Sequence, residues 1–388
     1  MKNFLFSEKD RSENNFFKLF DSAYLNDTRK LLFAFLVLFC LAGGLFFSGL
    51  LVAAVGGSPT KVLSSLIEGS FQTSGAFGRT LVEAVPLLLV SIGVIVSFRA
   101  GHYNIGTEGQ VAIGALFSAV IALQVSGPEW FVIVLAILGS FLGGAIWSGI
   151  AVGAYLWRRV DVMISTLLLT FIAPNVVLFA VSKDYLLLDT TKSNTRLASQ
   201  SERVPVERRL PEFEVFGQEL HWGVVVAVVL SLLLTVLLGK SVWGLKVRLL
   251  GANFVTAKRF GVTQGKEGAT ALLLSGGFSG LAGGMIVMGS AFRLQSHIAN
   301  DFGWDGLLSA LVSRLNGYFA LLSSIFFAAL RTGSSFLAAT GVSRTITSVI
   351  QGLMVIAALM PAALIVVISR SDFGRKRFGN QKKGEDEC

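Results

Sequence analysis

The chain has 388 residues, of which 53% are hydrophobic and only 15% are charged. Soluble globular proteins carry about 25% charged residues, so this composition excludes a water-soluble enzyme, and its hydrophobicity excludes a disordered chain. The net charge of +9 is explained by basic loops on one face of a membrane, so nucleic acid is not required as a partner.

Long apolar runs predict an all-α, polytopic membrane protein with about ten transmembrane helices and one broken or re-entrant element. Each span needs ~20 mostly apolar residues to cross ~30 Å of hydrocarbon. The 42 glycines favour closely packed helices over a β-barrel. The predicted spans cover residues 31–55, 80–98, 109–125, 130–156, 162–181, 222–239, 269–289, 304–313, 318–335 and 345–369.

Basic residues orient these spans. We predict a cytoplasmic N-terminal tail at 1–30, a transmembrane domain at 31–369 and a cytoplasmic C-terminal tail at 370–388. With the N-terminus inside, the segments on that face hold 22 Lys and Arg residues, whereas the segments on the opposite face hold 10. This asymmetry agrees with the positive-inside rule.

The densest group of polar residues and glycines lies between the second and third spans, at 98–110. Irregular backbone near membrane depth is tolerated only where it is buried in protein or lines a wet cavity. Two interpretations are compatible with this segment. Either its polar side chains border a transport pathway, or it is a tight cytoplasmic loop whose Glu108 caps the next helix. The candidate pathway residues are His102, Asn104, Glu108 and Gln110.

Two loops are long enough for further roles. Residues 182–221 form a mixed-charge loop on the extracytoplasmic side, with six basic and seven acidic residues. Residues 240–268 form a cytoplasmic segment with six basic residues and one acidic residue, Glu267. The centre of this second loop is amphipathic and predicts a short helix outside the bilayer, suited to docking a partner.

Other charged or small residues near the spans have simpler interpretations. Glu83 lies at the outer interface or faces the pathway. Asp161 places a negative charge at a helix N-terminus, and the small residues at 275–284 permit close helix packing. Arg314 and Arg331 are expected to extend toward an interface.

No motif for covalent or metal chemistry is present in the sequence. Gly239, Lys240 and Ser241 resemble the end of a phosphate-binding loop, but Leu234 stands where the first glycine is required. The three histidines are far apart and none pairs with cysteine, so we expect no metal site. The sequence therefore predicts no catalytic residues, no enzyme activity and no bound cofactor.

Several short motifs together resemble the permeases of ATP-binding cassette (ABC) importers that carry branched-chain amino acids, ribose-type sugars and nucleosides. They occur in the family's order and spacing and cover roughly residues 75–365. The form of the first motif is most similar to nucleoside-type permeases. The motifs are Phe98-Arg99-Ala100-Gly101 with Asn104-Ile105-Gly106 and Glu108-Gly109-Gln110; Ile164-Ser165-Thr166; Gly251, Asn253, Ala257 and Gly261-Val262; Asp305-Gly306 with Ala310-Leu311 and Arg314; Ala329-Leu330-Arg331 with Gly333-Ser334; and Val349-Ile350-Gln351-Gly352.

The resemblance implies a membrane subunit of an importer in a bacterial inner membrane. ATP would be bound by a separate ATPase subunit, a second permease subunit would complete a heterodimer, and an extracytoplasmic binding protein would deliver substrate. The segment 240–268 would couple to the ATPase. Its candidate contact residues are Gly251, Asn253, Ala257 and Gly261.

The sequence departs from the family pattern at a few positions, among them Thr170 and Ser313. Three alternatives stay open at this stage. The substrate is a sugar or a branched-chain amino acid rather than a nucleoside, or the chain is an ion-coupled secondary transporter. The last alternative would require acidic residues in the middle of a span, whereas Glu83 and Glu108 lie near predicted span ends.

Overall fold

A computed structural model describes residues 27–54, 58–73, 75–183, 185–189, 199–215, 217–339, 349, 352–358 and 360–361. The chain divides into a large unit, Ile67–Gly333, and a small unit made of Met1–Leu66 and Ser334–Cys388. Most of the predicted N-terminal tail, most of the predicted span at 345–369 and all of the predicted C-terminal tail lie outside the described residues.

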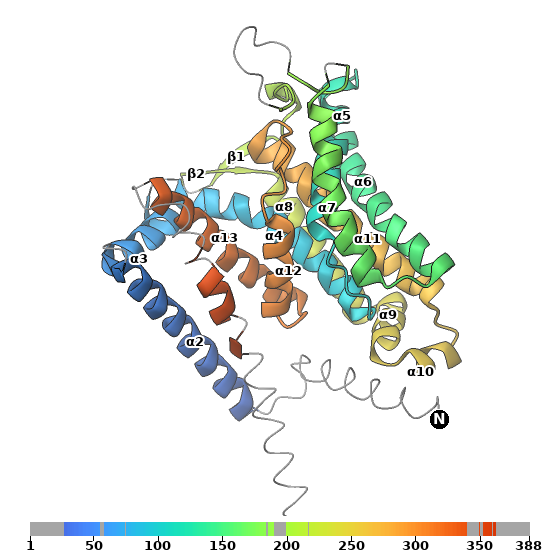
Figure 1. The fold of residues 1–388 in the computed structure, drawn as a ribbon, viewed down its shortest axis with the longest axis horizontal. Coiled ribbons are helices and arrows are strands. Elements are labelled where there is room, and N and C mark those ends of the chain that lie inside the picture. Colours follow the sequence, from blue (N-terminus) through green and yellow to red (C-terminus); the bar gives the residue numbers. More distant parts are fainter. Residues whose placement is uncertain are drawn as a thin grey trace, which may run out of the picture. The chain divides into compact units, whose positions relative to one another are not determined.

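The large unit is a helical bundle (Figure 1). Its long helices follow the apolar runs of the sequence, and short π-helical turns, η2 (Glu68–Gln72), η4 (Gln264–Gly268) and η5 (Val287–Ala291), precede or follow two of them. The helices are α4 (Ala76–Arg99), α5 (Thr107–Gln124), α6 (Glu129–Arg158), α7 (Val162–Val181), α8 (Gly223–Lys240), α9 (Val242–Ala252), α10 (Phe254–Arg259), α11 (Ala269–Ile286), α12 (Phe302–Val312) and the part of α13 (Gly317–Ala339) up to Gly333.

The small unit contains α2 (Asp27–Ala54) and most of α3 (Pro59–Ile67). Within this unit α2 packs closely against the helical residues 352–358. A Cβ atom added to Gly44 would lie 2.7 Å from the Cβ of Ala357. Glycine therefore permits the close approach of two helices here.

Seven helices among the described residues are long and apolar enough to cross a membrane. The prediction of a mostly helical, polytopic membrane protein is confirmed, but the count of about ten spans is not supported. One reason is α12, whose 11 residues extend only about 16 Å and cannot cross alone. The seven are α4, α5, α6, α7, α8, α11 together with η4 and η5, and α13 up to Ala338.

The loop predicted at 182–221 contains the exception to the all-α expectation. Strands β1 (Glu212–Val215) and β2 (Gln218–His221) form an antiparallel hairpin, in which Glu212 pairs with His221. A 3-10 turn, η3 (Val206–Arg208), precedes it. The hairpin is joined to the bundle by the backbone N–H of Gly78, which donates a hydrogen bond to Gln218 Oε1 at 2.8 Å.

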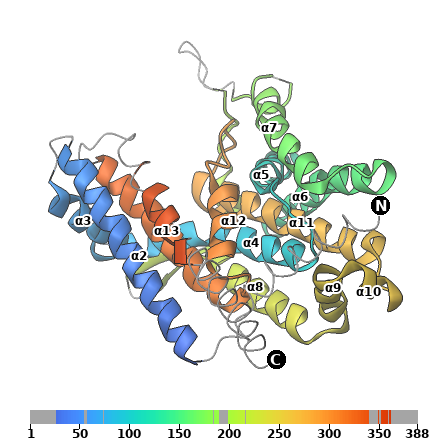
Figure 2. The ribbon, with the colours of Figure 1, turned by 60° about the horizontal axis from the view of Figure 1, so that its bottom comes forward.

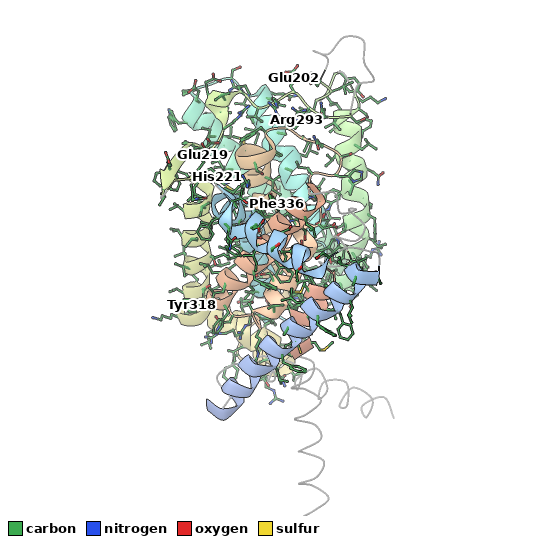
Figure 3. The ribbon with its side chains drawn as sticks, turned by 90° about the vertical axis from the view of Figure 1, so that its left-hand side faces the viewer. Glu202, Glu219, His221, Arg293, Tyr318 and Phe336 are labelled. Atoms are coloured by element: carbon green, nitrogen blue, oxygen red, sulfur yellow. The ribbon has the colours of Figure 1, made fainter. Side chains whose placement is uncertain are left out.

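The large unit has two distinct ends. We call them the hairpin end, which carries β1 and β2, and the α9–α10 end, where these two short helices lie beside each other (Figure 2). In the side view, Glu202, Glu219 and Arg293 lie toward the hairpin end and Tyr318 lies toward the other (Figure 3). Helix α4 runs the whole distance between the two ends.

Helix α11 is the centre of the large unit and packs against α4, α5 and α6. Glycines remove the side chains that would keep these helices apart. A Cβ atom on Gly280 would lie 2.3 Å from the carbonyl oxygen of Ser140 and 2.7 Å from the Cα of Gly144. The predicted packing role of the small residues at 275–284 is therefore confirmed, and α5, α6 and α11 form a block of tightly packed backbones.

This packing predicts the effect of adding one methyl group. Gly280→Ala should destabilise the protein by about 1–3 kcal/mol, because two helices would have to move apart. Gly239→Ala in α8 is the matched control, since no atom lies within 4 Å of the added Cβ. Thermal unfolding in detergent measures both, and equal midpoints for the two variants would contradict the packing.

Candidate functional site

The link between α4 and α5 is non-helical and is fixed by one amide side chain. Asn104 is completely buried. Its Nδ2 donates to Gln110 Oε1 and to Ser275 Oγ, both at 2.9 Å. Its Oδ1 accepts from Gln110 Nε2 at 3.0 Å and from the N–H of Gly106 at 3.1 Å. Asn104 thus joins the link to the first turns of α5 and to the middle of α11.

His102 occupies the same link, on the side that faces the α9–α10 end. Its ring makes an edge contact with Tyr155, with the ring centres 5.5 Å apart. Gly268 leaves the space for it, since a Cβ there would lie 2.5 Å from His102 Nε2. Burial lowers the pKa of His102, while the negative charge of Asp161 partly opposes this shift. The imidazole is therefore neutral at physiological pH.

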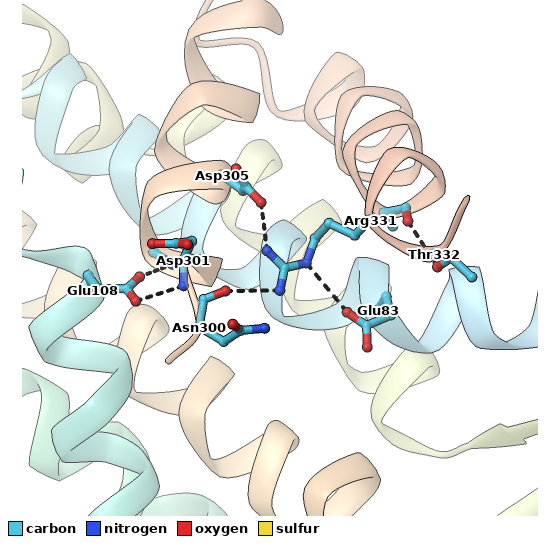
Figure 4. A network of polar contacts seen from close by, with 9 residues as sticks. Glu83, Glu108, Asn300, Asp301, Asp305, Arg331 and Thr332 are labelled. Carbon is cyan, nitrogen blue, oxygen red and sulfur yellow. Dashed lines mark hydrogen bonds and ion pairs between the residues drawn. The ribbon is translucent and has the colours of Figure 1, made fainter. Parts of the chain in front are cut away.

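Glu108 caps a helix, but not the one that the sequence suggested. Its carboxylate accepts hydrogen bonds from the backbone N–H groups of Asp301 at 2.9 Å and Gly303 at 2.7 Å (Figure 4). These groups belong to the start of α12, whose first N–H groups have no partner within the helix. Asp161 behaves as predicted, because its side chain accepts from Met163 N at the start of α7.

The segment before α12 is also non-helical. After η5 the chain runs without helix from Phe292 to Asp301, and both of these residues have positive φ angles. Near the hairpin end the segment is joined to the preceding loop, where Leu294 N donates to Ser201 Oγ at 2.9 Å. Together with α12 this segment forms an interrupted crossing. The sequence predicts irregular backbone at 98–110 and does not predict it here.

Arg331 lies at the centre of a charged group beside α12. Its Nη1 is 2.7 Å from Asp305 Oδ2, and its Nη2 donates to the carbonyl oxygen of Asn300 at 2.9 Å. Its Nε is 3.6 Å from Glu83 Oε2, and its guanidinium lies 4.0 Å from the ring centre of Phe302. Arg331 was expected to extend toward an interface, and that expectation is wrong because two carboxylates pair with it inside the bundle (Figure 4).

A second arginine binds the other end of α12. Arg99, at the last turn of α4, donates from Nε and Nη2 to the carbonyl oxygen of Leu315 at 3.2 and 3.0 Å. Leu315 follows α12 in a left-handed turn with φ of 56°. The amino-acid sequence alone does not predict these contacts of Asp305, Glu83 and Arg99. Only the high cost of intramembrane charge pointed to them, without identifying their partners.

The predicted coupling residues lie at the α9–α10 end. Gly251 is in contact with the end of α4, since an added Cβ would lie 2.3 Å from the carbonyl oxygen of Arg99. Asn253 caps α10, with its Oδ1 accepting from Thr256 N at 3.0 Å. These two residues connect α9, α10 and α4 within the chain.

The other two coupling residues also act inside this segment. Ala257 is fully buried and packs with Leu250 and Val262. Gly261 ends α10 with a positive φ of 74°, which glycine adopts without strain. Contact of these residues with a partner stays a prediction. The exposed apolar side chains of α10 and of the residue that follows it are Phe254, Val255 and Phe260.

Within the described ranges, no three His, Cys, Asp or Glu side chains come together in a way that could hold a metal ion. The arrangement consists of neutral amides, paired charges and interrupted helices in an apolar bundle. Such features are typical of solute pathways, where unwound backbone lines a cavity at mid-membrane.

Comparison with known proteins places these features in a family. The family described as "Branched-chain amino acid transport system / permease component" matches residues 76–359. The chain is 30% identical to the glucose ABC transporter permease protein of Haloferax volcanii, over 79% of this chain and 82% of the relative. No solved structure matches it significantly.

Two relatives come from Bacillus subtilis, and both are guanosine ABC transporter permease proteins. One is 26% identical over 75% of this chain and 82% of its own length. The other is 27% identical over 64% of this chain and 78% of its own length.

The Asn104 hydrogen bonds predict a large loss of stability on substitution. Asn104→Leu should lower the free energy of unfolding by on the order of 3 kcal/mol, because buried groups of Gln110 and Ser275 lose their partner. Asn175→Leu, on the exposed face of α7, is the control and should change little. Thermal unfolding in detergent compares them, and similar midpoints would contradict the role of Asn104.

The lowered pKa of His102 predicts a pH dependence of stability. Its stabilising effect is complete above the ordinary value of 6.5 and is lost as the pH falls below that value, because protonation favours the unfolded state. The unfolding temperature should therefore drop between about pH 7.5 and 5, and less so in His102→Gln. The exposed His297→Gln is the control, and an unchanged pH dependence in His102→Gln would refute the assignment.

Proposed function

The chain belongs to the family of branched-chain amino acid transport system permease components, and we propose that it forms the pathway for a nucleoside in an ATP-driven importer. The match over residues 76–359 carries this proposal. The nucleoside is supported by two guanosine permease relatives and by the motif around Asn104. The proposed substrate-pathway residues are His102, Asn104, Glu108 and Gln110.

We propose three kinds of protein partner. A separate ATPase subunit hydrolyses ATP, so the chain is not itself an enzyme and binds no cofactor. A second permease subunit forms a heterodimer with it, as the two guanosine permease proteins of one bacterium suggest. An extracytoplasmic binding protein delivers the substrate. In this arrangement both termini and the α9–α10 end are cytoplasmic, in the inner membrane of a bacterium.

The proposed route of coupling begins at the exposed apolar residues of α10. A movement of α9 and α10 would reach the end of α4 directly, because Gly251 touches the backbone of Arg99. It would reach the link between α4 and α5 through Gly268, which is packed against His102. Rigid-body movement of this kind switches a transporter between two access states when each state is favoured by its own partner contacts.

A sugar is the second candidate substrate, because the Haloferax volcanii relative is a glucose permease protein. Reconstitution of the chain with its ATPase, second permease and binding protein in liposomes separates the candidates. We expect ATP-dependent uptake of labelled guanosine that unlabelled guanosine blocks and excess glucose or leucine does not. Uptake of glucose or leucine alone would mean that the substrate is a sugar or an amino acid instead. Uptake without ATP would refute the proposal of an ATP-driven importer.

The exposed face of α10 gives a second test. Val255→Asp or Phe260→Asp should reduce ATPase binding and uptake at least about tenfold, because a charge would enter an apolar contact. Val206→Asp is the matched control, since Val206 is also exposed but lies toward the hairpin end. Co-purification of the ATPase with each variant measures the effect. Normal co-purification with Phe260→Asp would place the ATPase elsewhere.

A further inference from the structure

We propose that Asn300 and Asp301 line the water-filled pathway of the importer and contact the hydroxyl groups of the nucleoside that passes through it. This inference rests on the proposed function and deepens it, because neither residue is among the pathway residues that the sequence predicts. It comes from the non-helical segment that precedes α12. The polarity of the exposed side chains, their depth in the large unit and their lack of a structural role all point to water.

The segment from Phe292 to Asp301 has the polarity of a surface that faces water. Its buried side chains are apolar, whereas its most exposed side chains are polar or charged. The buried residues are Leu294, Ile298 and Ala299, and the exposed residues are Gln295, His297, Asn300 and Asp301. Polar and ionisable side chains at membrane depth face the protein interior or a water-filled cavity. This pattern therefore excludes lipid as the neighbour of the segment.

Helix α6 shows the opposite pattern on another face of the same unit. Every fourth residue along one side of this helix is about half exposed, and all of these residues are apolar. They are Val134, Leu138, Leu142, Ile146 and Ile150. Such a stripe is what contact with lipid requires. The exposed residues of the segment before α12 differ from it in chemistry but not in exposure, so the two faces meet different surroundings.

Asn300 and Asp301 lie well inside the large unit. The carbonyl oxygen of Asn300 accepts a hydrogen bond from Arg331, whose Nε is 3.6 Å from Glu83. Glu83 lies seven residues after the start of α4, which is about 10 Å from the hairpin end of that helix. Helix α4 has 24 residues, so it is about 36 Å long and exceeds the ~30 Å of hydrocarbon. The level of Asn300 is therefore within the hydrocarbon.

The surrounding network uses the backbones of these two residues and not their side chains. Arg331 binds the C=O of Asn300, and Glu108 binds the N–H of Asp301 (Figure 4). Aspartate is a preferred N-cap residue, but at the N-cap of α12 the Asp301 side chain makes no capping hydrogen bond. Its backbone φ is 65°, which glycine would adopt with less strain. Neither the helix nor the turn therefore explains the carboxylate.

The two side chains suit the ribose of a nucleoside. The carboxylate of Asp301 accepts hydrogen bonds from neighbouring hydroxyl groups, and the amide of Asn300 both donates and accepts them. Contacts of this kind are strong enough for a solute to enter and weak enough for it to leave, as passage through a membrane requires. The carboxylate also repels phosphate groups, so this lining favours a nucleoside over a nucleotide.

Thiol chemistry tests whether water and substrate reach these positions. Cys40 and Cys388 are replaced by alanine, and Asn300→Cys and Asp301→Cys are made separately in the complete reconstituted transporter. The probe is trimethylammonium-ethyl methanethiosulfonate. We expect it to react with both variants at least about tenfold faster than with the α6 control Leu142→Cys, because a permanent charge does not enter lipid. Guanosine should slow both reactions in at least one nucleotide state.

Two results of this experiment would overturn the proposal. Reaction of both variants as slowly as the control in every nucleotide state would mean that lipid or protein covers this face. Fast reaction that guanosine never slows would mean that water reaches the face but the substrate does not. If the wild-type transporter shows no ATP-dependent uptake at all, the proposed function itself fails, so the two failures are distinguishable.

Removal of the Asp301 side chain tests its contact with the solute. Asp301→Gly keeps the left-handed turn, so the unfolding midpoint should change little, but kcat for guanosine uptake at saturating binding protein should fall at least about fivefold. Asp301→Asn, which still binds hydroxyl groups, should keep most of the uptake. Glu129→Gln, at the start of α6, is the control. Wild-type kcat in Asp301→Gly would overturn the contact, and so would a fall in kcat that Asp301→Asn shares fully.

Discussion

Backbone polar groups inside a membrane must be satisfied within the protein, and this constraint governs the part of the chain around α12. A continuous helix satisfies them by itself, but an interrupted crossing exposes N–H and C=O groups at both ends. Glu108 binds the N–H groups of Asp301 and Gly303, and Arg99 binds the carbonyl oxygen of Leu315. Side chains of α5 and α4 therefore pair backbone groups at the two ends of α12.

The large unit combines two kinds of contact with different consequences. Glycine-mediated contacts join α5, α6 and α11 into a block in which backbones nearly touch, and such contacts allow little displacement. Helix α12 combines both kinds. Gly303 and Gly306 bring its backbone close to α5 and α4, and hydrogen bonds and ion pairs bind its N-terminus and its middle. The contact of Gly251 with the end of α4 links the large unit to the surface proposed to receive the ATPase.

The sequence was sufficient to locate most of the long helices and insufficient for the contacts between them. Apolar runs located α7 at its observed bounds and α8 within one residue, because burial in lipid requires ~20 apolar residues whatever the fold. The break between the predicted helices at 304–313 and 318–335, near Arg314, was also predicted from the sequence. Pairings such as Glu108 with Asp301, which are 193 positions apart, depend on how helices pack. Ala257 shows a related limit, since a small residue suits a buried position as well as a docking surface, and its contact with a partner stays a prediction.

The central claim is that Glu108 and Arg99 satisfy backbone groups at the two ends of α12. It is tested most directly by thermal unfolding in detergent of Glu108→Ala and Arg99→Ala, with the exposed Glu129→Ala as the control. The account predicts that each of the first two variants loses about 1–3 kcal/mol of stability, because buried backbone groups lose their partners, and that the control changes little. Unfolding midpoints equal to that of the control would contradict it.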